Sequence, residues 1–205
     1  MEDRSAFYEA VRVSLYRGTL PDWQKEPLDR LIDEGRARSR SDQDTAYVLA
    51  TAHHETGRFQ FMEEIGKGEG RTYGQPLRIW SNVSVAYYGR GFVQLTWAGN
   101  YGRMSAFLGI DLINNPDMAK EPEVAAKVIW EGMIRGMFTG KNLADFITAE
   151  SADYVGARQI VNGTDRDEEI AEFARQFESA LSLITEGSAC PLNRKSCPLH
   201  TGEAA

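Results

Sequence analysis

An apolar helical run that ends in a carboxyl group is the feature that most constrains this chain. The apolar members of the run are Ala46, Val48, Leu49, Ala50 and Ala52. Ser41 or Asp42 can cap the start of such a helix, and Gly57 is suited to ending it. The run therefore predicts a helix that carries Glu55 at its C-terminal end, directly after two histidines.

The rest of the chain is also mainly helical in pattern. Apolar residues recur at helical spacing in several stretches, which predict helices over residues 6–16, 22–34, 101–108, 123–138, 143–147, 152–161 and 167–184. Residues 58–86 hold many glycines and charges and predict a long surface loop, whereas residues 87–97 predict a short strand or hairpin. No alternation of strands and helices indicates a parallel sheet. We expect a mainly α fold with a small β element beside a cleft.

Composition limits the classes of protein that this chain can belong to. Its 205 residues are 42% hydrophobic and 26% charged, which is typical of a globular domain. The formal net charge of −7 argues against a nucleic-acid partner, because phosphate contacts need clustered Lys and Arg. The same charge gives no attraction to an anionic surface such as a bacterial wall. We expect one monomeric domain over residues 1–186 and a loose tail over residues 187–205.

The sequence offers no signal for membrane insertion or export. No stretch approaches the roughly 18 apolar residues that a bilayer span needs. The charged start lacks the apolar core of a signal peptide, so we expect cytoplasmic synthesis and, for any action outside the membrane, release by another agent. The only cysteines, Cys190 and Cys197, lie in the expected tail, which excludes a disulfide framework in the core.

Residues 87–97 contain a second informative motif, in which glycines separate polar and aromatic side chains. Tyr88, Gln94 and Thr96 supply a ring, an amide and a hydroxyl, a polar floor suited to an acetylated sugar. Cleavage of a glycosidic bond needs two carboxyl groups beside that bond, one of which donates a proton. Glu55 suits the donor role, because it follows an apolar helix and lies at the negative end of the helix dipole.

The second carboxylate must be ionised and able to hold a water molecule. Glu63, Glu64 and Glu69 follow Glu55 by eight, nine and fourteen positions. All three lie in the glycine-rich loop, from which a side chain can reach across a cleft. We favour Glu64, with Glu63 and Glu69 as alternatives.

Other kinds of site fit the sequence less well. His53 and His54 are adjacent, whereas a zinc protease needs histidines four positions apart around a Glu. We therefore expect no metal and no cofactor, with one histidine hydrogen-bonded near Glu55 and the other packed. The acidic residues 165–169 lack the spacing of a calcium loop. A peptidase or amidase would need a metal ligand set or a Cys/His pair, and neither is evident.

Three motifs occur in order along the chain, at residues 54–57, at residues 87–97 with 100–102, and at residues 158–163. Together they resemble glycoside hydrolase family 19, which includes plant-type chitinases and a branch of bacteriophage endolysins. The resemblance extends from about residue 45 to residue 183. It implies a lysozyme-like helical domain with a small β hairpin flanking the catalytic cleft. The short connection between the first two motifs resembles the endolysin branch.

The resemblance also implies roles for individual residues. Glu55 matches the general acid, and the short connection favours Glu64 as the carboxylate that activates water in an inverting reaction. Thr96 and Gln94 match residues that bind the sugar and hold that water. The other implied substrate-binding positions are His54, Tyr88, Asn100, Asn162 and Arg166.

The leading hypothesis is a muramidase-like endolysin that hydrolyses the β-1,4 bonds of peptidoglycan. Chitin and its oligomers carry the same acetamido sugars, so a chitinase is the alternative. A non-catalytic protein on the same scaffold, with a sugar-binding or structural role, is the third hypothesis.

Overall fold

The structure is a computed structural model that describes residues 2–80 and 83–186. Its helices are α1 (Ser5–Ser14), α2 (Asp22–Ala37), α3 (Asp42–Glu55), α4 (Ala98–Leu108), α5 (Pro122–Arg135) and α6 (Asp167–Leu181). Four short 3₁₀ helices lie between them, η1 (Thr72–Gly74), η2 (Pro116–Lys120), η3 (Leu143–Asp145) and η4 (Gly156–Ile160). The prediction of a mainly α fold is confirmed. The expected tail, with Cys190 and Cys197, lies outside the described residues.

Two small antiparallel pairs of strands complete the fold. The first joins β1 (Glu2–Asp3) to β4 (Thr185–Glu186), and the second is the hairpin of β2 (Leu77–Trp80) and β3 (Val83–Val85). The hairpin therefore lies inside the stretch that was predicted to be loop, and the predicted strand over residues 87–97 is wrong. That segment has isolated bridges only, because Gly91, Gln94 and Trp97 adopt positive φ angles that interrupt an extended strand.

Helix α3 is the centre of the helical body. The Ser41 side chain accepts a hydrogen bond from the Asp44 N–H at 3.0 Å, which confirms a predicted cap. Every residue from Asp44 to His53 is buried, and the helix packs most extensively against α6. Because α3 is surrounded on all sides, its C-terminal residue Glu55 has a fixed position relative to the body.

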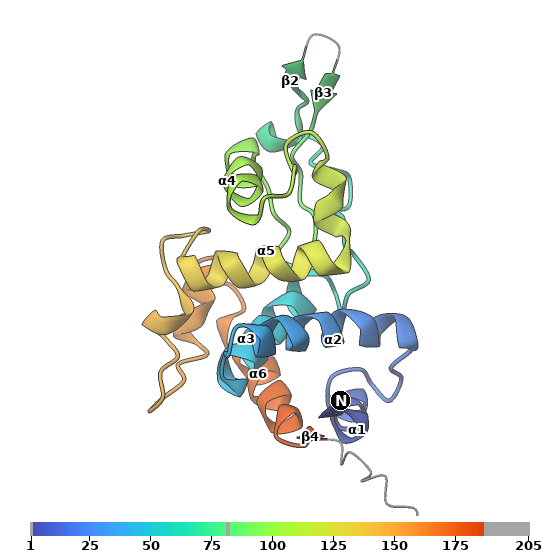
Figure 1. Ribbon diagram of the computed structural model, residues 1–205, viewed down its shortest axis with the longest axis vertical. Helices are drawn as coiled ribbons and strands as arrows, with labels where there is room; N and C mark the ends of the chain where they lie inside the picture. The colour runs from blue at the N-terminus through green and yellow to red at the C-terminus, as the bar shows by residue number, and fades with distance from the viewer. Residues whose placement is uncertain (1, 81–82, 187–205) are drawn as a thin grey trace, which may run out of the picture.

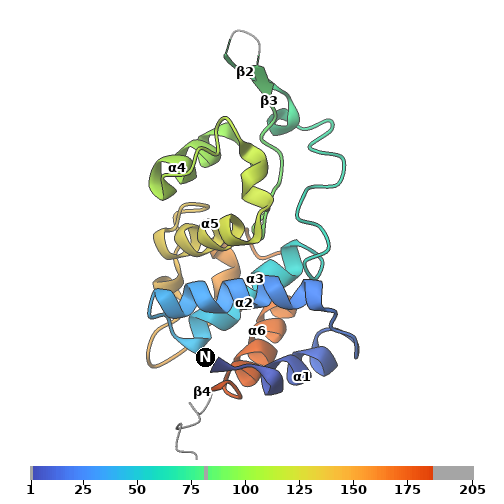
Figure 2. The same ribbon diagram turned by 45° about the vertical axis from the view of Figure 1, so that its right-hand side comes forward.

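Figures 1 and 2 show how the elements are distributed along the molecule. Helices α1, α2, α3 and α6 pack together at one end, and the β2–β3 hairpin projects at the opposite end beyond α4. Helix α5 lies between these two parts. Among the helices of the described ranges, none has the length and apolar character needed to cross a bilayer.

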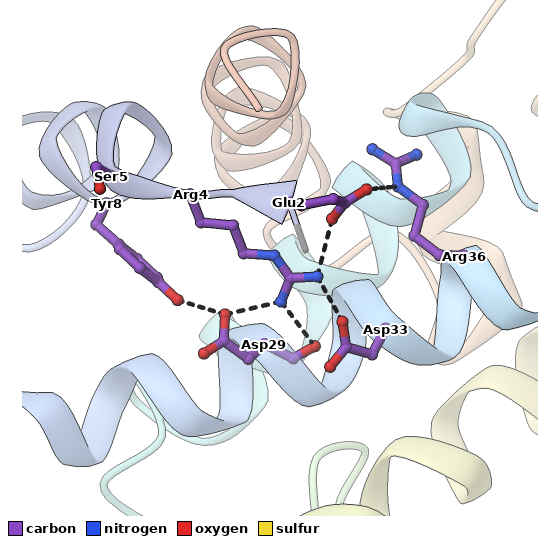
Figure 3. Close-up of a pocket in the computed structure, with 7 residues that line it drawn as sticks. All are labelled: Glu2, Arg4, Ser5, Tyr8, Asp29, Asp33 and Arg36. Carbon is purple, nitrogen blue, oxygen red and sulfur yellow. Dashed lines mark hydrogen bonds and ion pairs between the residues drawn. The ribbon is translucent and has the colours of Figure 1, made fainter. Parts of the chain in front are cut away.

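An ion-pair network fastens the N-terminal segment to α2 (Figure 3). Arg4 donates to Asp29 Oδ1 at 2.9 Å and to Glu2 Oε2 at 3.0 Å, and it also pairs with Asp33. Arg36 completes the network through Glu2 at 3.3 Å. These residues line a hollow of about 630 Å³, but their charges are paired with one another and none of them was predicted to belong to the site. The network is therefore best explained as an anchor for the N-terminal strand.

Close packing between α2 and α5 depends on one glycine. The Trp130 indole N–H donates to the Leu31 carbonyl at 2.9 Å, and a Cβ added at Gly35 would lie 2.8 Å from Trp130 Cζ2 and from Thr45 Oγ1. All of these neighbours lie in the interior, so they have little freedom to move aside.

We predict that Gly35→Ala destabilises the protein by about 1–3 kcal/mol, because the added methyl group overpacks the α2–α5 contact. Gly99→Ala is the matched control, since Gly99 also lies in a helix but has no atom within 4 Å of the added Cβ. The control should be neutral or stabilising by up to about 1 kcal/mol. Urea unfolding of both variants measures the difference, and equal effects would contradict the packing argument.

Candidate active site

Glu55 is the last residue of α3, and the chain turns sharply after it. Gly57, Arg58 and Phe59 have φ angles of 54°, 63° and 64°, three consecutive left-handed residues. The Thr56 hydroxyl stabilises this turn, because it donates to the Ala52 carbonyl at 2.6 Å and accepts from the Phe59 N–H at 2.8 Å. Strained backbone of this kind is held in place by its surroundings and clusters at functional sites. The turn directs the chain from the acid candidate into the loop that holds the base candidates.

A buried arginine holds the Glu55 carboxyl group. Arg158 Nη1 donates to Glu55 Oε1 at 2.7 Å, and Arg158 Nε donates to the Asp165 carbonyl at 3.0 Å. Arg158 is 2% exposed, whereas the Glu55 side chain is 20% exposed and so keeps one side open to solvent. No role was predicted for Arg158, although it opens the third motif. The chain holds 23 Lys and Arg residues, so the charge alone did not single this one out.

Glu64 accepts a hydrogen bond at each carboxylate oxygen. The Tyr73 hydroxyl donates to Oε1 at 2.8 Å, and the Gly89 N–H donates to Oε2 at 2.9 Å. The Glu64 N–H in turn donates to the Gly89 carbonyl at 2.8 Å. Glu64 is therefore held from two directions, by the loop that follows it and by the second motif. The Tyr73 contact was not predicted, because the sequence does not show which loop side chains reach Glu64.

Hydrogen bonds from backbone and side-chain N–H groups of the second motif join it to the Glu64 loop at several residues. The Gly91 N–H donates to the Met62 carbonyl at 2.9 Å, and Gln94 Nε2 donates to the Phe61 carbonyl at 3.2 Å. Glu63 forms an isolated bridge with Arg90. The motif thus supports the loop directly, as a short and irregular pairing.

Gln94 lies close to Glu64. A Cβ added at Gly89 would lie 2.8 Å from Gln94 Oε1 and 3.3 Å from Glu64 Oε2, so both side chains border the same point in space. Gln94 itself has a φ of 49° and donates a second hydrogen bond to the Gly91 carbonyl at 3.0 Å. The amide nitrogen is thereby occupied, which leaves the Gln94 oxygen beside the carboxylate. Gly89 is required because a side chain there would separate these groups.

The two alternative carboxylates have different surroundings. Glu63 accepts from the Tyr88 hydroxyl at 2.6 Å and pairs with Lys120 at 3.4 Å and Lys67 at 3.5 Å. The hydrogen bond from Tyr88, followed by the two lysine charges, lowers the pKa of Glu63 although burial opposes this. Glu69 is exposed. The geometry favours Glu64 over both, because Glu64 alone of the three borders Gln94 at Gly89.

Tyr88 does not have the position that we expected. The Arg90 guanidinium lies 3.6 Å from the centre of the Tyr88 ring, and the Tyr88 side chain is 8% exposed. Little ring surface is available for a sugar, although the resemblance implied that Tyr88 binds substrate. Tyr88 instead holds Glu63. Trp97, by contrast, is 50% exposed, and the centroid of its ring lies 5.6 Å from that of Tyr73 in an edge contact.

The other predicted polar residues are divided between two regions. Thr96 and Asn100 lie together within the second motif, since Asn100 Nδ2 donates to the Thr96 carbonyl at 2.9 Å. Asn162 and Arg166 are exposed and lie near Arg158 in the chain, where Arg166 pairs with Glu169 at 3.1 Å. His54 is half-buried next to Glu55, and burial lowers its pKa despite the opposing charge of Glu55.

His53 is packed in the core. Its ring makes edge contacts with Tyr16 at 5.2 Å, Phe173 at 4.9 Å and Phe177 at 5.7 Å. The prediction that one of the two histidines is packed is confirmed. Within the part of the chain that the structure describes, no group of three or more His, Cys, Asp or Glu side chains could hold a metal ion.

Comparisons with known proteins identify related sequences. Residues 36–142 match the model of glycoside hydrolase family 19, described as chitinase class I. An endochitinase of Arabidopsis thaliana is 43% identical over 82 residues, which are 39% of this chain and 28% of that protein. Endochitinase B of Zea mays is 32% identical over 140 residues, 65% of this chain and 44% of that protein. The chain thus spans less than half the length of these relatives.

Solved structures share the fold at lower sequence identity. Chitinase C from Streptomyces griseus has a TM-score of 0.65 and 20% identity, over 88% of this chain and 76% of that chain. A class IV chitinase of family 19 from Zea mays has a TM-score of 0.55 and 18% identity, over 85% of this chain and 92% of that chain. These similarities support the arrangement of elements and not a particular substrate.

We predict that His53 makes the protein less stable in mild acid. Burial, with help from the charges of Arg58 and His54, lowers the pKa of His53 from 6.5 to about 3. Between these values the unfolded chain binds a proton that the folded chain does not, so the free energy of unfolding falls as pH falls below 6.5. When the pH falls from 7 to 5, the free energy of unfolding of His53→Leu should therefore decrease by about 2 kcal/mol less than that of the wild type. Urea unfolding at both pH values measures this, and parallel pH profiles would contradict it.

Proposed function

The chain belongs to glycoside hydrolase family 19, and we propose that it hydrolyses β-1,4 bonds between N-acetylated amino sugars by general acid–base catalysis. The observation that carries this proposal is the pair of differently held carboxyl groups. Glu55 is fixed at the end of α3 by a buried arginine, and Glu64 is fixed on a separate loop by a phenol and a backbone N–H. Two such groups are what glycoside cleavage requires.

Glu55 is the general acid in this proposal. When it gives its proton to the glycosidic oxygen it becomes a carboxylate, and Arg158 is already within hydrogen-bond distance of that carboxylate. A guanidinium cannot lose its charge in a protein, so Arg158 stabilises the developing negative charge without any rearrangement. The open side of Glu55, with 20% of the side chain exposed, is where the sugar approaches.

Glu64 is the general base and acts on water. Each of its oxygens accepts one hydrogen bond, which orients the group and leaves further acceptor positions free. A water molecule that Thr96 orients gives a proton to Glu64 and attacks the anomeric carbon on the face opposite to Glu55, and the configuration inverts. The Gln94 oxygen is available to accept a hydrogen bond from an acetamido N–H. Asn100, Asn162, Arg166 and His54 are the remaining candidates for contacts with the sugar.

We place peptidoglycan first as the substrate and chitin second. Residues 58–86 connect the first two motifs, and this short connection resembles the endolysin branch of the family. The second candidate is favoured by the related endochitinases of Arabidopsis thaliana and Zea mays. Both polymers present the same acetamido group to Gln94.

We predict that Glu55→Gln loses at least about 100-fold in kcat, because an amide cannot donate the catalytic proton. Glutamine keeps an oxygen that can accept from Arg158, so the fold should be preserved. Glu64→Gln should show a similar loss, whereas Glu69→Gln, an exposed carboxyl in the same loop, is the matched control and should keep wild-type turnover. Release of reducing ends measures all three, and wild-type rates for Glu55→Gln would end the proposal.

We predict that purified peptidoglycan releases reducing ends faster than chitin oligomers at equal sugar concentration. The reverse order would make chitin the substrate and leave the mechanism unchanged. Binding of either oligomer without turnover by the wild type would instead favour the non-catalytic alternative. One set of assays therefore separates the three hypotheses.

A further inference from the structure

Gly68 and Gly74, six positions apart in the Glu64 loop, are in direct backbone contact. A Cβ added at Gly74 would lie 2.0 Å from the Gly68 carbonyl oxygen and 2.7 Å from Gly68 Cα, so the two backbones touch. Gly68 is buried although it lies in a loop whose other members are mostly exposed, and its φ is 72°. No other residue type has room at Gly74, because the neighbour there is backbone and cannot rotate away.

The same contact leaves space for the Tyr73 ring. A Cβ added at Gly68 would lie 3.1 Å from Tyr73 Cε2 and 3.1 Å from Tyr88 Cβ. On another side, the Tyr73 ring makes an edge contact with the Trp97 ring, with 5.6 Å between the two ring centroids. Tyr73 is therefore confined between Gly68 and Trp97, and its hydroxyl is directed to Glu64 Oε1 at 2.8 Å.

We propose that Gly68 and Gly74 form a backbone clasp that sets the position of Tyr73, and that Tyr73 in turn orients Glu64 for its action on water. This proposal rests on the proposed function, since it assigns Glu64 as the base. Glu64 lies on a chain segment without regular secondary structure, so its carboxylate needs contacts on more than one side. Gly89 supplies one fixed contact and Tyr73 the other, and the clasp holds the second. Gly68, Gly74 and Tyr73 are thus positioning residues.

The protonation of Tyr73 agrees with this arrangement. Burial raises the pKa of the Tyr73 phenol, and the hydrogen bond to Glu64 and the charge of Glu64 raise it further. The phenol is therefore a proton donor throughout the neutral range, as the role requires. Its titration also reports whether the contact with Glu64 is intact.

The test compares two glycines that share one backbone conformation. Gly68 and Gly70 both have a φ of 72°, but a Cβ at Gly70 has nothing within 4 Å. Alanine at either position meets the same unfavourable backbone conformation, and only Gly68→Ala also opens the clasp. Gly68→Ala should lower kcat by about tenfold, the loss expected when the one hydrogen bond from Tyr73 to Glu64 is broken, with KM within about twofold. Gly70→Ala should stay within about threefold of the wild type in both.

A double-mutant cycle identifies Tyr73 as the intermediary. Tyr73→Phe keeps the ring and removes the donor, and should lower kcat by about tenfold. If the clasp acts through the Tyr73 hydroxyl, the double variant Gly68→Ala/Tyr73→Phe should be no slower than Gly68→Ala alone, within about threefold. Losses that multiply, or equal losses for Gly68→Ala and Gly70→Ala, would overturn the proposal.

A measurement that needs no turnover separates this inference from the proposed function. Titration of Tyr73 by NMR with labelled tyrosine should show its pKa falling toward 10.0 in Gly68→Ala and in Glu64→Gln, and remaining raised in Gly70→Ala. An unchanged Tyr73 titration in Gly68→Ala would overturn the clasp even if the enzyme is active. If the variants show these shifts but the wild type cleaves neither polymer, the proposed function is overturned and the clasp is not.

Discussion

The ion pair between Glu55 and Arg158 is the interaction on which the candidate site depends. It connects the end of α3 to a residue 103 positions later in the chain, at 2.7 Å. Arg158 is almost fully buried, and a buried cation without a partner is strongly unfavourable. The pair therefore fixes the third motif against the first. It also places a permanent positive charge where the proposed reaction leaves a negative one.

Signals from neighbouring residues were enough to predict α3, but not the β2–β3 hairpin. The α3 cap at Ser41, its apolar run and its end near Gly57 are all signals carried by neighbouring residues, and the structure agrees with each of them. The β2–β3 hairpin has strands of four and three residues inside a glycine-rich stretch. Strands that short give too few alternating positions to be distinguished from loop. The aromatic residues of the second motif suggested a strand. Its glycines and its residues with positive φ angles instead bind the loop that carries Glu64.

Members of the candidate site could be predicted where the residue type itself supplies the chemistry. They could not be predicted where their role depends on a contact with another residue. Glu55, Glu64 and Gln94 were proposed from the sequence because their side chains carry suitable functional groups. Arg158 and Tyr73 were missed because their value lies in a distance to a carboxylate, and the Glu55–Arg158 contact spans 103 residues. Tyr88 was misjudged for the same reason, since its ring is covered by Arg90, a neighbour only two positions away. Side-chain direction within an irregular segment is not encoded in spacing.

The three left-handed residues after Glu55 separate two structural supports. Before them, the acid candidate belongs to the rigid helical body; after them, the base candidate is attached to the second motif and to its own loop. The two supports meet in the core, where the centroids of the Phe59 and Phe92 rings lie 5.5 Å apart. A substitution at this contact is therefore expected to disturb the acid candidate and the base candidate together.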